Sequence, residues 1–125
     1  RYLVQNKSVS ALKLWGLALE RLVFNPEYDA AVTYFTRTDL DGTPGADEAV
    51  EGISNFLNAT CGGADVILVL REKPDGTIKG SMRSLTRDIS GFCKAFGGGG
   101  HKQAAGFTVK GKIGTENGQV RILSA

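Results

Sequence analysis

The sequence has little of what stabilises small secreted or metal-binding proteins. Its 125 residues contain only two cysteines, Cys61 and Cys93, which stand far apart, and a single histidine, His101. This set indicates neither a disulfide framework nor a zinc site. Reduced, structural thiols in a cytoplasmic protein are therefore expected.

Long apolar runs and a strong charge of either sign are also missing. No run approaches the roughly 18 to 20 apolar residues that cross a bilayer, and residues 1–7 lack the apolar core of a signal peptide. A soluble protein without a membrane partner is expected. The net charge of +2 is far from that of a protein that coats DNA in bulk, so any phosphate binding must be local.

The length and the share of hydrophobic residues, 42%, suit a single domain with its own core. The chain begins with Arg1 and enters helix-like sequence almost at once, which indicates a segment of a longer protein. Within it we expect an N-terminal helical segment (1–27) that continues from a missing domain, a core (28–109) and a tail (110–125).

Apolar periodicity predicts three helices, at 8–23, 47–59 and 88–96. Short apolar runs predict four strands, at 29–36, 64–71, 77–84 and 107–109. The run from Val66 to Leu70 is the strongest strand signal and should lie centrally in a sheet. A turn at 73–76 joins it to an antiparallel partner. The tail pattern does not separate a short helix from an edge strand.

These elements predict an α/β (α+β) fold, in which one mixed sheet of about four to five strands is packed by about three helices. Polar residues at 37–46 should form a connection. The acidic residues there and in the following helix, Asp39, Asp41, Asp47 and Glu48, lack the spacing of a calcium loop, and the last two suit a helix start. We expect no metal site and no catalytic residue in this chain.

The most distinctive local feature is a run of four glycines, Gly97 to Gly100, followed by His101. Glycine accepts the φ angles at which several backbone N–H groups converge on an anion. Lys102 would add donors, and a helical turn starting over 102–105 would point free N–H groups at the same anion. A flexible linker is the alternative, but the run lies between an amphipathic helix and a small-residue turn.

Cationic and hydroxyl side chains precede this run at the end of a predicted strand. The guanidinium of Arg83 can bind two phosphate oxygens, and the Ser84 hydroxyl can donate to the same group. The His101 ring can hydrogen-bond a phosphate or act as an acid near neutral pH. Lys79 and Arg37 are further candidates. The sequence thus predicts a phosphate site at one edge of the sheet.

Three segments in a fixed order make the sequence resemble the DHH-associated C-terminal domain of DHH phosphoesterases: Gly80-Ser81-Met82-Arg83-Ser84, Asp88-Ile89, and Phe96-Gly97-Gly98-Gly99-Gly100-His101-Lys102-Gln103-Ala104-Ala105-Gly106. The helix sequence over 47–57 is similar to that group as well. Within the superfamily the segment looks most like the nanoRNase (oligoribonuclease) and pAp-phosphatase type, which cleaves very short oligonucleotides and dephosphorylates 3′-phosphoadenosine 5′-phosphate (pAp).

The resemblance implies that one set of residues contacts substrate phosphate or nucleotide across a cleft from an N-terminal DHH catalytic domain: Arg83, Ser84, Gly98, Gly99, Gly100, His101 and Asn55. It also implies Mn²⁺ or Mg²⁺ in that catalytic domain. The Asp-His-His motif itself is absent from this chain, so we expect no hydrolysis by this segment alone.

Several alternatives stay open. The chain could be a stand-alone nucleic-acid-binding module, or the substrate domain of a RecJ-type exonuclease, a cyclic-dinucleotide phosphodiesterase or an exopolyphosphatase-like protein. The related terminal domain of an alanyl-tRNA synthetase shares the glycine-rich character but fits Arg83-Ser84 and His101 less well. Phosphate contacts carry little base information, so the sequence does not choose among these substrates, nor does it decide whether the protein is a homodimer.

Overall fold

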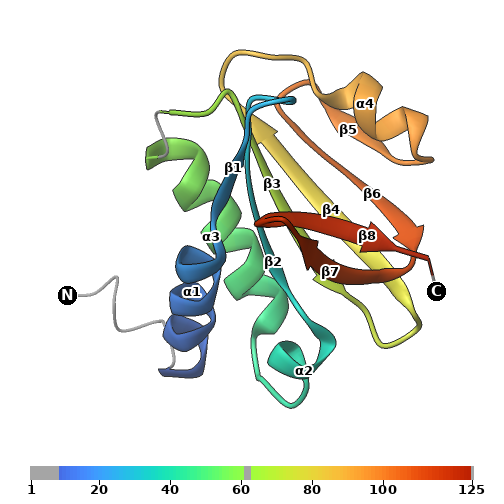
Figure 1. The fold of residues 1–125 in the computed structure, drawn as a ribbon. Coiled ribbons are helices and arrows are strands. Elements are labelled where there is room, and N and C mark those ends of the chain that lie inside the picture. The colour runs from blue at the N-terminus through green and yellow to red at the C-terminus, as the bar shows by residue number, and fades with distance from the viewer. Residues whose placement is uncertain (1–8, 61–62, 125) are drawn as a thin grey trace.

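The computed structural model describes residues 9–60 and 63–124, which form a mixed β-sheet (Figure 1). Two long helices cover one face of the sheet, and a short helix and a hairpin cover the other. Its helices are α1 (Val9–Arg21), α2 (Arg37–Leu40), α3 (Ala46–Thr60) and α4 (Ser90–Ala95). Its strands are β1 (Val23–Asn25), β2 (Ala30–Phe35), β3 (Val66–Glu72), β4 (Thr77–Ser84), β5 (Gly99–His101), β6 (Ala104–Lys110), β7 (Lys112–Glu116) and β8 (Gln119–Leu123).

Six strands form the main sheet in the order β1-β2-β3-β4-β6-β5. Strands β2 and β3 are parallel, and α2 and α3 lie in the crossover between them; the other neighbours are antiparallel. The apolar run of β3 lies in the middle of the sheet, as predicted. No helix in the described ranges is long and apolar enough to cross a membrane.

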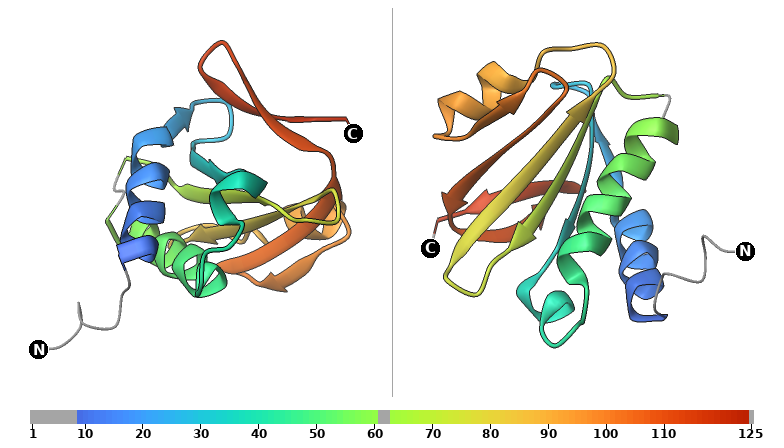
Figure 2. Two further views of the ribbon diagram at one scale, coloured as in Figure 1. Left: turned by 90° about the horizontal axis from the view of Figure 1, so that it is seen from below. Right: turned by 180° about the vertical axis from the view of Figure 1, so that it is seen from behind.

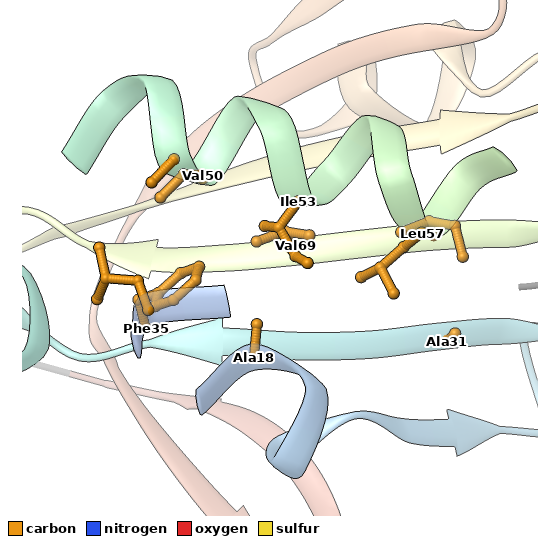
Figure 3. Close-up of a cluster of buried hydrophobic side chains, with 10 residues drawn as sticks. Ala18, Ala31, Phe35, Val50, Ile53, Leu57 and Val69 are labelled. Carbon is orange, nitrogen blue, oxygen red and sulfur yellow. The ribbon is translucent and has the colours of Figure 1, made fainter. Parts of the chain in front are cut away.

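Helices α1 and α3 cover one face of the sheet, which we call the helix face. Leu14 and Ala18 of α1 and Ile53 and Leu57 of α3 pack on Ala31, Phe35, Ile67 and Val69 of β2 and β3 (Figure 3). Ala18, Phe35, Ile53 and Val69 have no solvent exposure. This cluster forms because the odd-numbered positions of both strands point to the same face. Most of them are apolar; Thr33 is buried among them with its hydroxyl donating to the Ala18 carbonyl at 2.6 Å, and Arg71 lies near the end of β3.

The opposite face is covered by α4 and by a two-stranded hairpin, β7–β8 (Figure 1). A second buried cluster, which includes Val66, Leu70, Ile78, Met82 and Cys93, lies there. Burial raises the pKa of the Cys93 thiol, as expected for a structural cysteine. Cys61 lies outside the described residues.

The predicted mixed α+β fold is confirmed, with more strands than expected. The first helix ends at Arg21 rather than at residue 23, and Val23–Asn25 pairs with β2 as an edge strand. The connection at 37–46 contains the one-turn helix α2. The tail, left open by its pattern, forms the β7–β8 hairpin. Such short strands depend on pairing with a neighbouring strand, and three to five residues are too few for a clear periodic pattern.

The segment after the glycine run also differs from expectation. No helical turn starts over 102–105; a tight turn joins β5 to β6, and Ala104 already pairs in the sheet. The reason is that Gly99–His101 can pair with β6 only if the chain reverses at once. The strand predicted at 107–109 is accordingly longer and begins at Ala104.

Candidate phosphate-binding site

The helices leave half of the helix face uncovered. Viewed from behind, α3 runs beside β3 and β4, while β6 and β5 lie beyond it with neither α1 nor α3 over them (Figure 2). Ile78 and Met82 of β4 point to the opposite core, so Lys79, Ser81 and Arg83 point to the helix face. We call the helix side of β4, β6 and β5 the open face.

The strand register brings the two predicted ends of the site into one row. Arg83 of β4 lies opposite Ala104 of β6, and Ala104 lies opposite His101 of β5. Two strand spacings separate Arg83 from His101, about 10 Å between their Cα atoms. Because the residue between them is a small alanine, a ligand lying over β6 has both side chains within reach.

The next row is made of small residues. Ser81 of β4 lies opposite Gly106 of β6, which lies opposite Gly99 of β5. No bulky side chain rises between the strands in this row. The open face is therefore a shallow floor bordered by cationic or polar side chains, which suits an extended phosphate-bearing chain.

Arg83 is held firmly by α3. Its Nε donates to Asn55 Oδ1 at 3.2 Å, and its Nη2 donates to the two carboxylate oxygens of Glu51 at 2.6 and 2.8 Å. Nη1 donates to the carbonyl of Met82 at 3.0 Å. The Arg83 side chain is 12% exposed and that of Glu51 56% exposed. The guanidinium is fixed at the margin of the open face, with most of its N–H groups occupied.

Asn55 therefore lies next to Arg83, as a shared site requires, whereas Glu51 was not anticipated as a partner of Arg83. Both side chains come from α3, one turn apart, and Glu51 and Asn55 thus face the same way. That i, i+4 spacing was visible in the sequence. What the sequence did not show is that β4 runs beside this turn of the helix.

Ser84 is buried, and its hydroxyl is engaged within the protein. The Oγ donates to the carbonyl of Asp65 at 2.7 Å and accepts from the N–H groups of Thr86 and Arg87. These bonds order the turn that follows β4. A direct bond from Ser84 to a phosphate stays a prediction and requires this hydroxyl to leave Asp65.

The glycine run follows α4 and forms part of the sheet rather than a free loop. Gly97 has a φ of 82°, and its N–H donates to Lys94, while that of Gly98 donates to Cys93. A Cβ on Gly98 would lie 2.0 Å from the Gly106 carbonyl oxygen, and one on Gly100 2.7 Å from Ala105 Cα. Glycine is needed here because two backbones touch. The N–H groups of Gly97 and Gly98 are thus engaged within the protein; phosphate contacts from Gly98, Gly99 and Gly100 stay a prediction.

His101 is exposed and borders a shallow pocket of about 470 Å³ at the end of the open face. Arg87, Lys102 and Ala104 also line it. The β5–β6 turn is fastened to the loop after β4, since the N–H of Ser84 donates to Gln103 and that of Ile89 to Lys102. These bonds hold the side chains of Arg87, His101 and Lys102 around one hollow, which the Asp88 carboxylate also lines.

Two of the acidic residues, Asp39 and Asp47, pair with arginines. Within residues 9–60 and 63–124, no group of three or more His, Cys, Asp or Glu side chains is placed to hold an ion. Burial alone would raise the pKa of Asp39, but hydrogen bonds from Arg21 and Thr36 outweigh it and hold the pKa below its usual value. Asp47, near the start of α3, pairs with Arg71.

The two further candidates lie in different places. Lys79 is exposed on the open face, two rows from Arg83. Arg37 is the first residue of α2, where its backbone N–H donates to Glu72. Since α2 follows β2, which is three strands away from β6 in the sheet, Arg37 is not part of the open face.

Two solved structures are similar to this fold. An exopolyphosphatase-related protein from Bacteroides fragilis is 26% identical, with a TM-score of 0.71 over 82% of this chain and 30% of its own. A pGpG-specific phosphodiesterase from Vibrio cholerae is 12% identical, with a TM-score of 0.53 over 80% of this chain and 33% of its own. The second likeness shows the fold alone. This chain spans about a third of the length of either protein.

A family model extends the match to the sequence itself. The model described as the DHHA1 domain matches residues 30–121, from β2 to the middle of β8, and thus most of the chain. The matched range includes every residue of the open face and both partners of Arg83. The chain therefore belongs to the family of DHHA1 domains, which are associated with DHH-family phosphoesterases.

Proposed function

We propose that this chain is the substrate-binding domain of a DHH-family phosphoesterase of the nanoRNase and pAp-phosphatase type. The observation that carries the proposal is the row Arg83, Ala104 and His101 across the open face. It unites two motifs that lie apart in the sequence around a floor of small residues. Short oligonucleotides and pAp are the proposed substrates, held by their phosphates.

The hydrogen bonds of Arg83 define how it would bind a phosphate. Arginine carries five N–H groups, and four contacts in this structure engage Asn55, Glu51 and the Met82 carbonyl. A phosphate that takes one remaining Nη1 N–H leaves Glu51 in place. One that takes two parallel bonds has to displace Glu51, which is more than half exposed and free to turn into solvent.

Binding and positioning are the contributions of this chain. Arg83 and His101 would fix the phosphate, and Lys102, which lines the His101 pocket, would add positive potential; Arg87 lines the same pocket but pairs with Asp29 and Asp65. Hydrolysis requires the N-terminal DHH domain, where Mn²⁺ or Mg²⁺ would activate water. The described residues offer no cluster for such an ion, so the metal chemistry is assigned to that partner domain.

Binding of a 5′-phosphorylated dinucleotide and of pAp, measured by calorimetry on this chain, tests the proposal. Arg83→Ala should lower affinity about tenfold or more, since a charged hydrogen bond contributes roughly 1.5 to 3 kcal/mol, and adding His101→Ala should lower it further. Arg121→Ala is the matched control, because Arg121 is exposed on β8 across the sheet. Equal binding by wild type and the Arg83→Ala, His101→Ala variant would reject the site.

Polyphosphate is a second candidate substrate, favoured by the similarity to the exopolyphosphatase-related protein at 26% identity. An open face that binds phosphates without reading bases would accept either chain. Competition separates the two. If tripolyphosphate displaces the dinucleotide at lower concentration than pAp does, polyphosphate is the better substrate; the nucleotide proposal expects the reverse.

A further inference from the structure

A second group of cations lies at the margin of the open face, where β3 and β4 meet the first turns of α3. Arg71 of β3 and Lys79 of β4 are directly opposite each other in the antiparallel register, on the same side of the sheet. Like charges in this position repel and destabilise a strand pair. Lys73, the residue that follows β3, lines the same pocket as Arg71 and Lys79. The sheet therefore carries an electrostatic cost at this point that folding alone does not require.

The acids nearby do not balance this group. Asp47 pairs with Arg71 at 2.5 Å, and Glu51 pairs with Arg83. The side chains of Lys73 and Lys79 make no ion pair within the described ranges, which leaves two positive charges uncompensated. The positive charge of this group acts on Asp47: the hydrogen bond and charge of Arg71, together with the charges of Lys73 and Lys79, lower the pKa of Asp47.

These cations line a pocket of about 180 Å³ together with Ser81 and with the carboxylates of Asp47 and Glu51, which are already paired with Arg71 and Arg83. The Ser81 hydroxyl has no hydrogen-bond partner among the described residues, so it is available as a donor. Arg71 Nε is the buried side-chain nitrogen that lacks an acceptor in the part of the chain described. Such a group is uncommon in folded proteins and calls for an explanation, for example a missing anion or water nearby.

We propose that the hollow of Lys73, Lys79, Arg71 and Ser81 is a second phosphate subsite, which takes a phosphate further along the substrate than the one bound near Arg83. The proposal rests on the proposed function, since it extends the same open face. Oxyanions relieve the repulsion between Arg71 and Lys79 and supply the acceptor that Ser81 lacks.

The distance between the subsites sets the length of substrate that gains from both. Arg83 and Lys79 are four residues apart on β4, about 14 Å between Cα atoms. A single phosphate cannot touch both. A dinucleotide would be held near Arg83 alone, whereas a longer oligonucleotide would reach Lys79 and Lys73. The two subsites together therefore favour oligonucleotides of several nucleotides over a dinucleotide.

The test compares a 5′-phosphorylated dinucleotide with a 5′-phosphorylated pentanucleotide, titrated against the whole 125-residue chain at several salt concentrations. For Lys73→Gln, Lys79→Gln we expect about tenfold weaker pentanucleotide binding and a salt slope smaller by about 1.4, since each phosphate contact to a single strand contributes about 0.7. Dinucleotide binding should stay within about twofold.

Lys13→Gln, Lys112→Gln is the matched control, because both lysines are exposed and neither is on the open face. It loses the same charge and should bind both ligands like wild type. If the Lys73, Lys79 variant binds the pentanucleotide as the control does, the second subsite is wrong. Arg83→Ala, included with the dinucleotide, reports on the proposed function separately: that function fails if this variant binds the dinucleotide like wild type, whatever the lysines do.

Discussion

The helix face of the sheet has two halves that follow the same alternation and serve different purposes. On β2 and β3 most positions facing the helices are apolar, and α1 and α3 bury them. On β4 and β6 the same positions carry Lys79, Ser81, Arg83 and Gly106, and no helix covers this side of β6 (Figure 2). One half is thus a core, and the other is a surface whose composition folding does not explain. The buried half stabilises the fold, and the uncovered half is the surface on which we propose that substrate binds.

The largest expected effect breaks the covered half. Ile53 has no solvent exposure and points from α3 toward Val69 of β3 (Figure 3). Ile53→Ala should lower the free energy of unfolding by about 3 kcal/mol, within the usual range for deleting a buried isoleucine side chain. Urea denaturation followed by circular dichroism measures it. Lys79→Ala, on the open half, should change stability by less than about 0.5 kcal/mol; a similar loss in both would refute the division.

The second prediction concerns the margin of the open half. Gly98→Ala would place a Cβ 2.0 Å from a backbone oxygen of β6, whereas one on Gly99 would meet only the Lys94 side chain at 3.9 Å. Gly98→Ala should therefore destabilise the protein by about 1 to 3 kcal/mol, as overpacking does. Gly99→Ala is the control and should unfold nearly like wild type. Equal thermal midpoints for the two variants would show that β5 is not held against β6 as described.

The covered half was largely predictable from the sequence, because its signals are local. The run Val66 to Leu70 predicts a central strand, and Pro74 and Gly76 predict the turn after it. The short strands were missed for the opposite reason. Gly99–His101 has low intrinsic strand propensity and forms a strand only because β6 supplies its partners. The tail hairpin did carry a signal, Asn117-Gly118, both at positive φ.

The candidate site was predictable in its members but not in their connections. The motifs pointed to Arg83 and His101, and the sheet register places them in one row. Glu51 did not stand out, because an acid on an amphipathic helix is ordinarily a solvated surface residue. Its contact with Arg83 joins residues 32 positions apart. Such a contact depends on which strand the helix lies beside, and that is a property of the tertiary fold.

A smaller effect concerns an ion pair that is better buried than the Arg83–Glu51 pair of the open half, where the Glu51 side chain is 56% exposed. The Arg21–Asp39 pair is mostly buried, with side chains 21% and 14% exposed. Burial opposes the charged form of Asp39, yet hydrogen bonds from Arg21 and Thr36 keep its pKa lowered. A lowered pKa stabilises the fold above the unfolded value of about 3.9, and this stability disappears as pH falls through the folded value.

Asp39→Asn should accordingly lower the free energy of unfolding by about 1 kcal/mol at pH 7, and it should flatten the loss of stability below about pH 4. Urea titrations between pH 2 and pH 7 give both quantities. Asp41→Asn is the control, since Asp41 is exposed in the same loop. If wild type and Asp39→Asn lose stability in parallel through the acid range, the buried pair does not have the assigned role.

The smallest expected effect asks how Asn55 acts in the open half. Its Oδ1 accepts from Arg83 Nε, so Asn55 can work by holding Arg83 rather than by touching phosphate. Asn55→Ala should weaken dinucleotide binding by about threefold, comparable to one exposed hydrogen bond. Asn58→Ala, a residue further along α3, is the matched control.

A double-mutant cycle decides between the two roles of Asn55. If it acts through Arg83, Asn55→Ala should have no further effect on binding in an Arg83→Ala background, because there is then no guanidinium to hold. If Asn55 contacts the phosphate itself, the two losses should add. Additive losses would move Asn55 into the binding surface. A fully coupled pair would make α3, the helix that closes the covered half, also the element that orients the chief cation of the open one.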